Sequence, residues 1–252
     1  MRRGLAALAA IGLALTTQAY AETWTIASLR WPPYSGAALE RQGAGIHVLR
    51  TALARIGVDL KVVYLPWRRA QAVAARRDEV VGYYPAWPSE VAHGFFPSAP
   101  VFTSPLGFAE RTTDPITWTR LSDLGGKRIG FVRDYVYPEP LRKAANTGVI
   151  RRVRVRSDLT GLRFLELGRI DALAIDAHVM HHLLATEPVL AQAAPRIAFD
   201  ARTVARMDLV VAFEKRRENV VRAARLRDAL ERIDARRLID HYLARWYGGS
   251  SP

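Results

Sequence analysis

Aromatic side chains follow several of the apolar runs that the sequence predicts to be strands. They are Trp31, Tyr34, Tyr84, Trp87, Tyr135 and Tyr137. Together with a few charged groups, rings at such positions can wall a pocket for a small polar molecule. The alternative is that they are ordinary core aromatics, since large rings are mostly buried. Trp67, which stands at the start of a predicted helix, fits the core better than a pocket.

Three histidines, His178, His181 and His182, fall at helical spacing and could present two imidazoles on one helix face. Imidazole pairs can bind a metal, but no carboxylate or cysteine partner stands beside them in the pattern. A solvent-exposed helix therefore explains the three histidines better than a metal site does. We expect neither a metal nor a cofactor.

The chain has a formal net charge of +13, which raises the possibility of an anionic partner. Arg152, Arg154 and Arg156 alternate with valines along one predicted strand and share one of its faces. No aromatic residues interleave with them, as nucleic-acid-binding surfaces prefer. The other arginines are scattered over the whole chain, so we expect a solvent-facing strand and no nucleic-acid partner.

Motifs of the common enzyme classes are missing from the sequence. We find no G-x-S-x-G, H-E-x-x-H, P-loop or G-x-G-x-x-G pattern. This argues against an enzyme without excluding one.

The elements that must position these residues alternate between short strands and amphipathic helices, which predicts α/β lobes with parallel sheets. In the first half we expect strands at 24–29, 58–65 and 80–84, and helices at 45–56 and 66–77. A further strand at 106–110 follows a Pro-containing stretch. The pattern restarts after Asp114-Pro115, with strands at 128–132, 150–156 and 170–175, and helices at 138–146, 158–168 and 176–185. Two further strands, 196–199 and 208–213, precede one long helix whose apolar stripe runs from Leu226 to Trp246.

Ligands of open parallel sheets bind beyond the carboxyl ends of the strands. In this chain that rule selects the segments after Leu29, Leu65, Tyr84, Val132 and Ile175. Most of the candidate aromatic residues lie on these segments.

The N-terminus has the three parts of a secretory signal peptide. Arg2 and Arg3 precede an apolar stretch at 5–15, and Ala19-Tyr20-Ala21 supplies a small-residue cleavage pattern. The stretch would span roughly 16 Å as a helix, too short to cross a bilayer. We therefore expect residues 1–21 to be removed. The chain contains no cysteine, which excludes disulfides and a lipid-anchored N-terminal cysteine, so we expect a soluble periplasmic or secreted protein.

Several short motifs, in this order, resemble the bacterial extracellular solute-binding proteins of family 3. They are Trp31-Pro32-Pro33-Tyr34, Pro66-Trp67-Arg68-Arg69-Ala70, Phe96-Pro97-Ser98-Ala99-Pro100, the segment 121–130 and Leu167-Gly168-Arg169-Ile170-Asp171-Ala172. The resemblance implies a two-lobed periplasmic-binding-protein fold of type II, with a ligand cleft between lobes that are joined by two hinge strands. It implies crossings near 108–112 and 207–211, with lobe 1 formed by 22–110 and 207–252 and lobe 2 by 111–206. The C-terminal helix would pack back on the first lobe.

The resemblance also implies a function: a monomeric periplasmic protein that captures a small polar, amino-acid-like solute by lobe closure. It would deliver this ligand to a membrane transporter permease. A periplasmic dehydratase or lyase that uses Asp176, or a ligand sensor, remains an alternative with the same cleft.

Only some of the family's ligand-binding residues have counterparts in this sequence. Asp176 stands where amino-acid binders of the family hold the ligand's amino group with an acid, although a carboxylate there is also a good helix N-cap. The family's carboxylate-binding arginine is replaced by Val91 in Trp87-Pro88-Ser89-Glu90-Val91, which puts α-amino-acid binding in doubt. Arg69, Arg111 or Arg133 could substitute for it, and the sequence does not choose among them.

Overall fold

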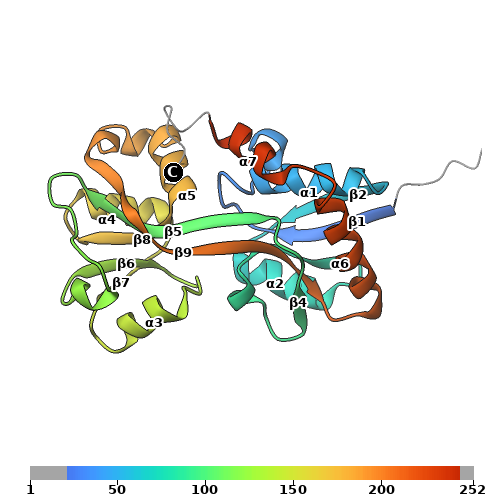
Figure 1. Ribbon diagram of the computed structural model, residues 1–252, viewed down its shortest axis with the longest axis horizontal. Coiled ribbons are helices and arrows are strands. Elements are labelled where there is room, and N and C mark those ends of the chain that lie inside the picture. Colours follow the sequence, from blue (N-terminus) through green and yellow to red (C-terminus); the bar gives the residue numbers. More distant parts are fainter. Residues whose placement is uncertain (1–21, 245–252) are drawn as a thin grey trace, which may run out of the picture.

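The structure is a computed structural model that describes residues 22–244. The predicted signal peptide and Trp246 lie outside this range. Figure 1 shows two α/β lobes side by side, connected by two long strands, β5 (Phe102–Arg111) and β9 (Ile197–Glu214).

The first lobe is built on three parallel strands in the order β2-β1-β3. They are β1 (Glu22–Ser28), β2 (Val58–Tyr64) and β3 (Val80–Ala86), connected by α1 (Ala44–Ala54) and α2 (Trp67–Arg76). Every residue of β3 is buried, as expected for the middle of a sheet that is covered on both faces. The predicted β-α-β-α-β order is confirmed.

The second lobe repeats this arrangement with the parallel strands β8-β6-β7. Its elements are β6 (Arg128–Val132), α3 (Glu139–Asn146), β7 (Arg151–Val155), α4 (Asp158–Glu166), β8 (Ala172–Asp176) and α5 (Ala177–Thr186). The predicted strands and helices of this region are confirmed to within a few residues at their ends.

Strands β5 and β9 form the antiparallel ladder between the lobes. From Leu106 to Glu110, β5 already pairs with β8 of the second lobe. Residues 210–214 of β9 pair with β3 and with the short strand β4 (Phe95–Pro97) of the first lobe. The first crossing therefore lies at 102–105, before the 108–112 expected from the sequence, whereas the return crossing at 206–209 overlaps the expected 207–211. The domain limits drawn from the resemblance stay a prediction.

Two predictions about the last third of the chain are wrong. The separate strands at 196–199 and 208–213 are one strand, β9, whose middle contains no buried residue and no apolar alternation. The single long C-terminal helix is two helices, α6 (Arg217–Leu230) and α7 (Ala235–Leu243). The Asp234 side chain accepts a hydrogen bond from the Arg237 amide at 2.9 Å and starts α7 as its N-cap.

Helix α7 packs back on the first lobe, where the Tyr242 hydroxyl donates to the Glu40 carbonyl at 2.9 Å. Single turns of 3-10 helix lie in the connections, at Glu40–Gln42, Pro88–Glu90, Leu121–Leu124, Pro188–Leu190 and Ala194–Arg196. Within residues 22–244, no helix has the length and apolar character needed to cross a membrane.

Candidate functional site

A small cavity lies where the strand ends of the first lobe meet the loop that follows β6 in the second lobe. Its volume is about 30 Å³, close to the space that one water molecule occupies. It is lined by Leu29, Trp31, Trp67, Pro85, Trp87, Glu90, Tyr135 and Leu209. The lobes therefore contact each other around this cavity, and a bound molecule larger than water would have to displace some of these side chains.

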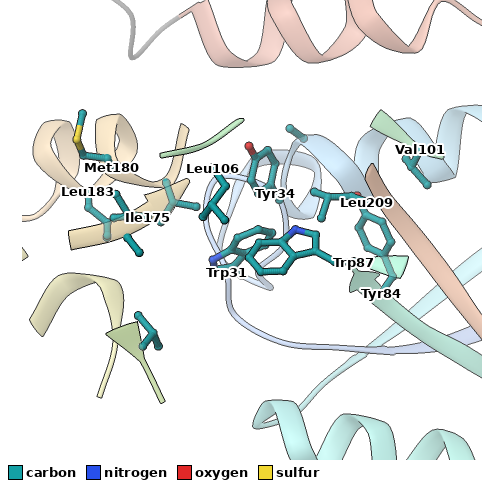
Figure 2. Packing of buried hydrophobic residues seen from close by; sticks show 14 of the residues in the cluster. Trp31, Tyr34, Tyr84, Trp87, Val101, Leu106, Ile175, Met180, Leu183 and Leu209 are labelled. Carbon is teal, nitrogen blue, oxygen red and sulfur yellow. The ribbon is translucent and has the colours of Figure 1, made fainter. Parts of the chain in front are cut away.

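Two tryptophans of the first lobe form the centre of this cleft (Figure 2). The Trp31 and Trp87 rings are 6.4 Å apart and nearly perpendicular. Each also contacts a tyrosine of the second lobe: Trp31 lies 6.5 Å from Tyr135, and Trp87 lies 6.4 Å from Tyr137, again edge to face. Aromatic groups from both lobes therefore pack against one another across the cleft.

The indole N–H groups of Trp31 and Trp87 have no hydrogen-bond partner among the described residues. Both side chains are buried, with only 7% and 4% of the residue exposed. A buried donor without an acceptor costs free energy, so the site holds two donors that a bound molecule could satisfy.

Tyr34 and Asp176 connect the lobes by hydrogen bonds. The Tyr34 hydroxyl donates to both carboxylate oxygens of Asp176, at 2.9 and 3.0 Å, and both residues are buried. The Ser104 hydroxyl also donates to Asp176, and the Val179 amide donates to it at 2.9 Å as part of the N-cap of α5. Burial and the adjacent carboxylate raise the pKa of Tyr34 well above its usual value, which keeps the phenol protonated as a donor.

Glu90 brings a carboxyl group from the first lobe to the cavity wall. Its Oε1 accepts the Val136 amide of the second lobe at 2.8 Å, and its Oε2 lies 3.5 Å from the Trp87 amide. Burial raises the pKa of Glu90 to about 7, although the two amides oppose that shift.

Asp158, the first residue of α4, places a second carboxyl group behind the cavity wall. Its Oδ2 accepts the Tyr135 hydroxyl at 3.1 Å. Burial raises the pKa of Asp158 to about 7, the Tyr135 hydroxyl opposes the shift, and the charge of Asp176 adds to it. The Trp31 indole N–H also lowers the pKa of Asp158, although its geometry does not meet the criteria for a hydrogen bond. Two carboxyl groups in one cleft that titrate near neutrality are typical of functional sites.

The remaining predicted tyrosines lie outside the cavity lining. Tyr137 is buried behind Tyr135 and Trp87, where its hydroxyl accepts the Val132 amide at 2.8 Å. Tyr84 is buried in the core of the first lobe, with its hydroxyl against Gly45 at the start of α1.

The predicted arginines also lie away from the cavity. Arg69 is exposed on α2, and Arg133 is exposed at an open groove of the second lobe that Arg142, Arg152 and Arg154 also line. Arg111 donates to the carbonyls of Leu165 and Ile170 and pairs with Asp114 at 2.6 Å. None of these three arginines is among the residues that line the cavity, although the groove at Arg133 shares Tyr135 with it.

Charged pairs lie at the rim of the cleft. Arg68 of α2 pairs with Asp134 of the second lobe at 2.6 Å, and Arg30 pairs with Glu187 at 3.6 Å. The Arg68 and Arg30 side chains are 79% and 76% exposed, so these pairs stabilise closure only weakly and are screened by salt.

Sequence reasoning missed Glu90, Asp158 and the cavity contact of Trp67. The strand-end rule could have found Asp158, which follows the carboxyl end of β7 within three residues. Glu90 lies on the segment after Tyr84 that the same rule selects, but no local pattern showed that its carboxyl group would reach the cavity.

The three histidines form no metal site with their neighbours. In the described part of the chain, no group of three or more histidine and acidic side chains is placed to hold a metal. Burial lowers the pKa of His178 and His181, and burial and Arg30 together lower that of His182 to about 4. All three imidazoles are therefore mostly neutral at pH 7.

No protein-family model and no curated protein matches the chain. Solved structures do. A histidine kinase sensor domain, described as similar to periplasmic binding proteins, matches with a TM-score of 0.70 at 17% identity, covering 91% of this chain and 98% of that one. The GluR0 ligand-binding core in complex with L-glutamate matches with a TM-score of 0.70 at 16% identity, covering 92% and 100%. An ancestral arginine-binding protein bound to arginine matches with a TM-score of 0.67 at 15% identity, covering 90% and 98%.

These similarities cover nearly the whole of each chain. At such low sequence identities they are evidence for a shared fold only. The chain has the two-lobed α/β fold of periplasmic binding proteins, as the resemblance implied.

Proposed function

We propose that the chain is a solute-binding protein of the bacterial periplasm, which encloses a small polar molecule between its lobes and presents it to a membrane transporter. The observation that carries this proposal is the cleft itself. Its wall combines aromatic rings from both lobes with buried polar groups that have unused hydrogen-bonding capacity.

The contacts across the cleft explain how capture and closure are coupled. Tyr34 with Asp176, Glu90 with the Val136 amide, and Trp31 with Tyr135 each join one lobe to the other. A ligand that touches both lobes would add to or replace these contacts, and so shift the population toward closure.

The comparisons support a binding role of this kind. The structures with this fold include the arginine-binding protein and the substrate-binding protein of an amino acid ABC transporter. We infer that the chain likewise acts without catalysis, as a monomer, after its leader has been removed during export.

A sensor is the second candidate, because the kinase sensor domain shares the fold over nearly the full chain. Both candidates require ligand binding in the cleft. They differ in the membrane protein that recognises the closed form: a permease that takes up the ligand, or a receptor whose signalling output changes.

Ligand binding is expected to stabilise the chain against unfolding. At a hundredfold excess over Kd, the added free energy is about 2.7 kcal/mol, which a thermal shift measurement resolves easily. A panel of polar metabolites, added to protein that has been unfolded and refolded to remove bound molecules, is a direct way to measure it.

The controls are two tryptophan variants. Trp87→Ala removes a wall of the cavity and should abolish the thermal shift, whereas Trp118→Ala changes a tryptophan that packs on Phe108 in the second lobe and should retain it. If neither the panel nor any molecule released from freshly purified protein produces a shift in the unaltered chain, the proposed function is wrong.

A further inference from the structure

Resting on the proposed function, we propose that the ligand is a small organic cation that carries no carboxylate, held by the Trp31, Trp87 and Tyr135 rings and the Glu90 carboxylate. The proposal is based on the aromatic and acidic groups that line the cavity and on the lack of arginine and lysine among the described residues that line it.

The cavity wall presents aromatic rings and one acidic group. Trp31, Trp67, Trp87 and Tyr135 supply the rings, and Glu90 is the one charged residue among the eight that line it. Aromatic faces attract ammonium and guanidinium groups, most strongly where water is excluded, and a nearby carboxylate adds a Coulomb attraction. This combination favours a cationic ligand.

The surroundings of the cavity disfavour an anionic group. Glu90 is in its wall, while Asp158 and Asp176 lie behind Tyr135 and Tyr34. Among the described residues no arginine or lysine lines the cavity, and Arg68 is paired with Asp134 at the exposed rim. A ligand carboxylate would enter this site without a countercharge and beside like charges, which is costly for a buried ion.

The indole N–H group of Trp87 refines the class further. Trp87 is more than nine-tenths buried, lines the cavity and lacks an acceptor for its indole among the described residues. A neutral acceptor on the ligand, such as a hydroxyl oxygen, would satisfy it without introducing negative charge. An amino alcohol or a substituted ammonium with a hydroxyl group fits all of these features.

The decisive experiment compares compounds that keep the cationic end and differ in the carboxylate. Choline is paired with glycine betaine, agmatine with arginine, and cadaverine with lysine. Titration calorimetry on refolded, ligand-free protein is expected to show that the carboxylate-free member of at least one pair binds tenfold or more tightly than its partner.

Glu90→Gln is the matching variant. It keeps the size of the side chain and removes its charge, so cation affinity should fall by tenfold or more. Glu79→Gln makes the same change at an exposed position beside β3 and should leave the affinity unchanged. Thermal unfolding of both variants shows whether they are folded.

The outcomes separate the ligand class from the function. If the carboxylate-bearing member binds more tightly in every pair, or if Glu90→Gln binds as well as the unaltered chain, the ligand class is wrong and solute binding stands. If a neutral or anionic molecule co-purifies and stabilises the protein, the ligand class is again wrong. If no compound binds and nothing co-purifies, both proposals are wrong.

Discussion

Replacing Asp176 by alanine is expected to lower the free energy of unfolding of the ligand-free protein by about 3 to 5 kcal/mol. Asp176 is 3% exposed and accepts hydrogen bonds from the Tyr34 hydroxyl, the Ser104 hydroxyl and the Val179 amide. Alanine would leave two buried hydroxyls and the first turn of α5 without their acceptor. It would also remove a hydrogen bond that joins the lobes, so the closed arrangement should be depopulated.

Urea denaturation measures this loss, and the chain contains a matched control. Asp234 also accepts a backbone amide as an N-cap, at 2.9 Å from the Arg237 nitrogen, but it is exposed and lies away from the cleft. Asp234→Ala should therefore cost only about 1 kcal/mol, the usual contribution of a cap. Equal losses in the two variants would show that Asp176 is merely a helix cap and does not hold the lobes together.

Affinity for a cationic ligand is expected to fall about tenfold between pH 8 and pH 6 for each carboxyl group that must be ionised for binding. If both Glu90 and Asp158 must be ionised, the affinity should fall about a hundredfold. Burial raises the pKa of both groups to about 7 when the lobes are closed. A bound cation favours the carboxylate form, so it must displace the protons that are present at lower pH. Binding is therefore strongest above pH 7 and is lost progressively below it.

The groups that face these carboxyls contribute little titration of their own over this range. Asp158 faces Tyr135, Tyr137 and Asp176, and burial raises the pKa of both tyrosines well above neutrality. Glu90 faces Tyr83 as well as these tyrosines, with the Arg68–Asp134 pair beside it, and burial also raises the pKa of Tyr83. His178 lies near Asp176, and burial lowers the pKa of this imidazole, which keeps it largely neutral.

Calorimetry in buffers with different ionisation enthalpies measures the protons released on binding. At pH 7, about half a proton should be released for each participating carboxyl group, since a group is half-protonated at its pKa. Glu90→Gln should remove its share of both the proton release and the pH dependence. An affinity that is constant from pH 6 to pH 8 would show that neither carboxyl group is coupled to the ligand.

Much of the fold could be predicted from local patterns. The strands and helices of both lobes are covered on their apolar faces, so their periodicity reports burial directly. The middle of β9 could not be predicted in this way, because none of residues 201–208 is buried and their apolar and polar side chains do not alternate. The break between α6 and α7 has a local signal in the Asp234 cap, which the continuous apolar stripe obscured.

The candidate site could be predicted only in outline. The strand-end rule selected Trp31, Trp87 and Tyr135, which do line the cavity. It could not predict which way a side chain points, and Arg69 and Arg133 lie exposed on the surface. The roles of Glu90 and Asp158 depend on desolvation in the folded chain, which no local pattern encodes.

The most direct test of the whole account is the distance between the lobes with and without ligand. The chain contains no cysteine, so Arg76→Cys on α2 and Lys143→Cys on α3 would provide two unique sites for a fluorophore pair. These exposed positions lie on one helix of each lobe (Figure 1). We predict that a small-molecule ligand shortens the distance in refolded protein and leaves it unchanged when Trp31→Ala is added. A protein that binds its ligand with no change in this distance, or that shortens equally with Trp31→Ala, would contradict capture by lobe closure on the aromatic cleft.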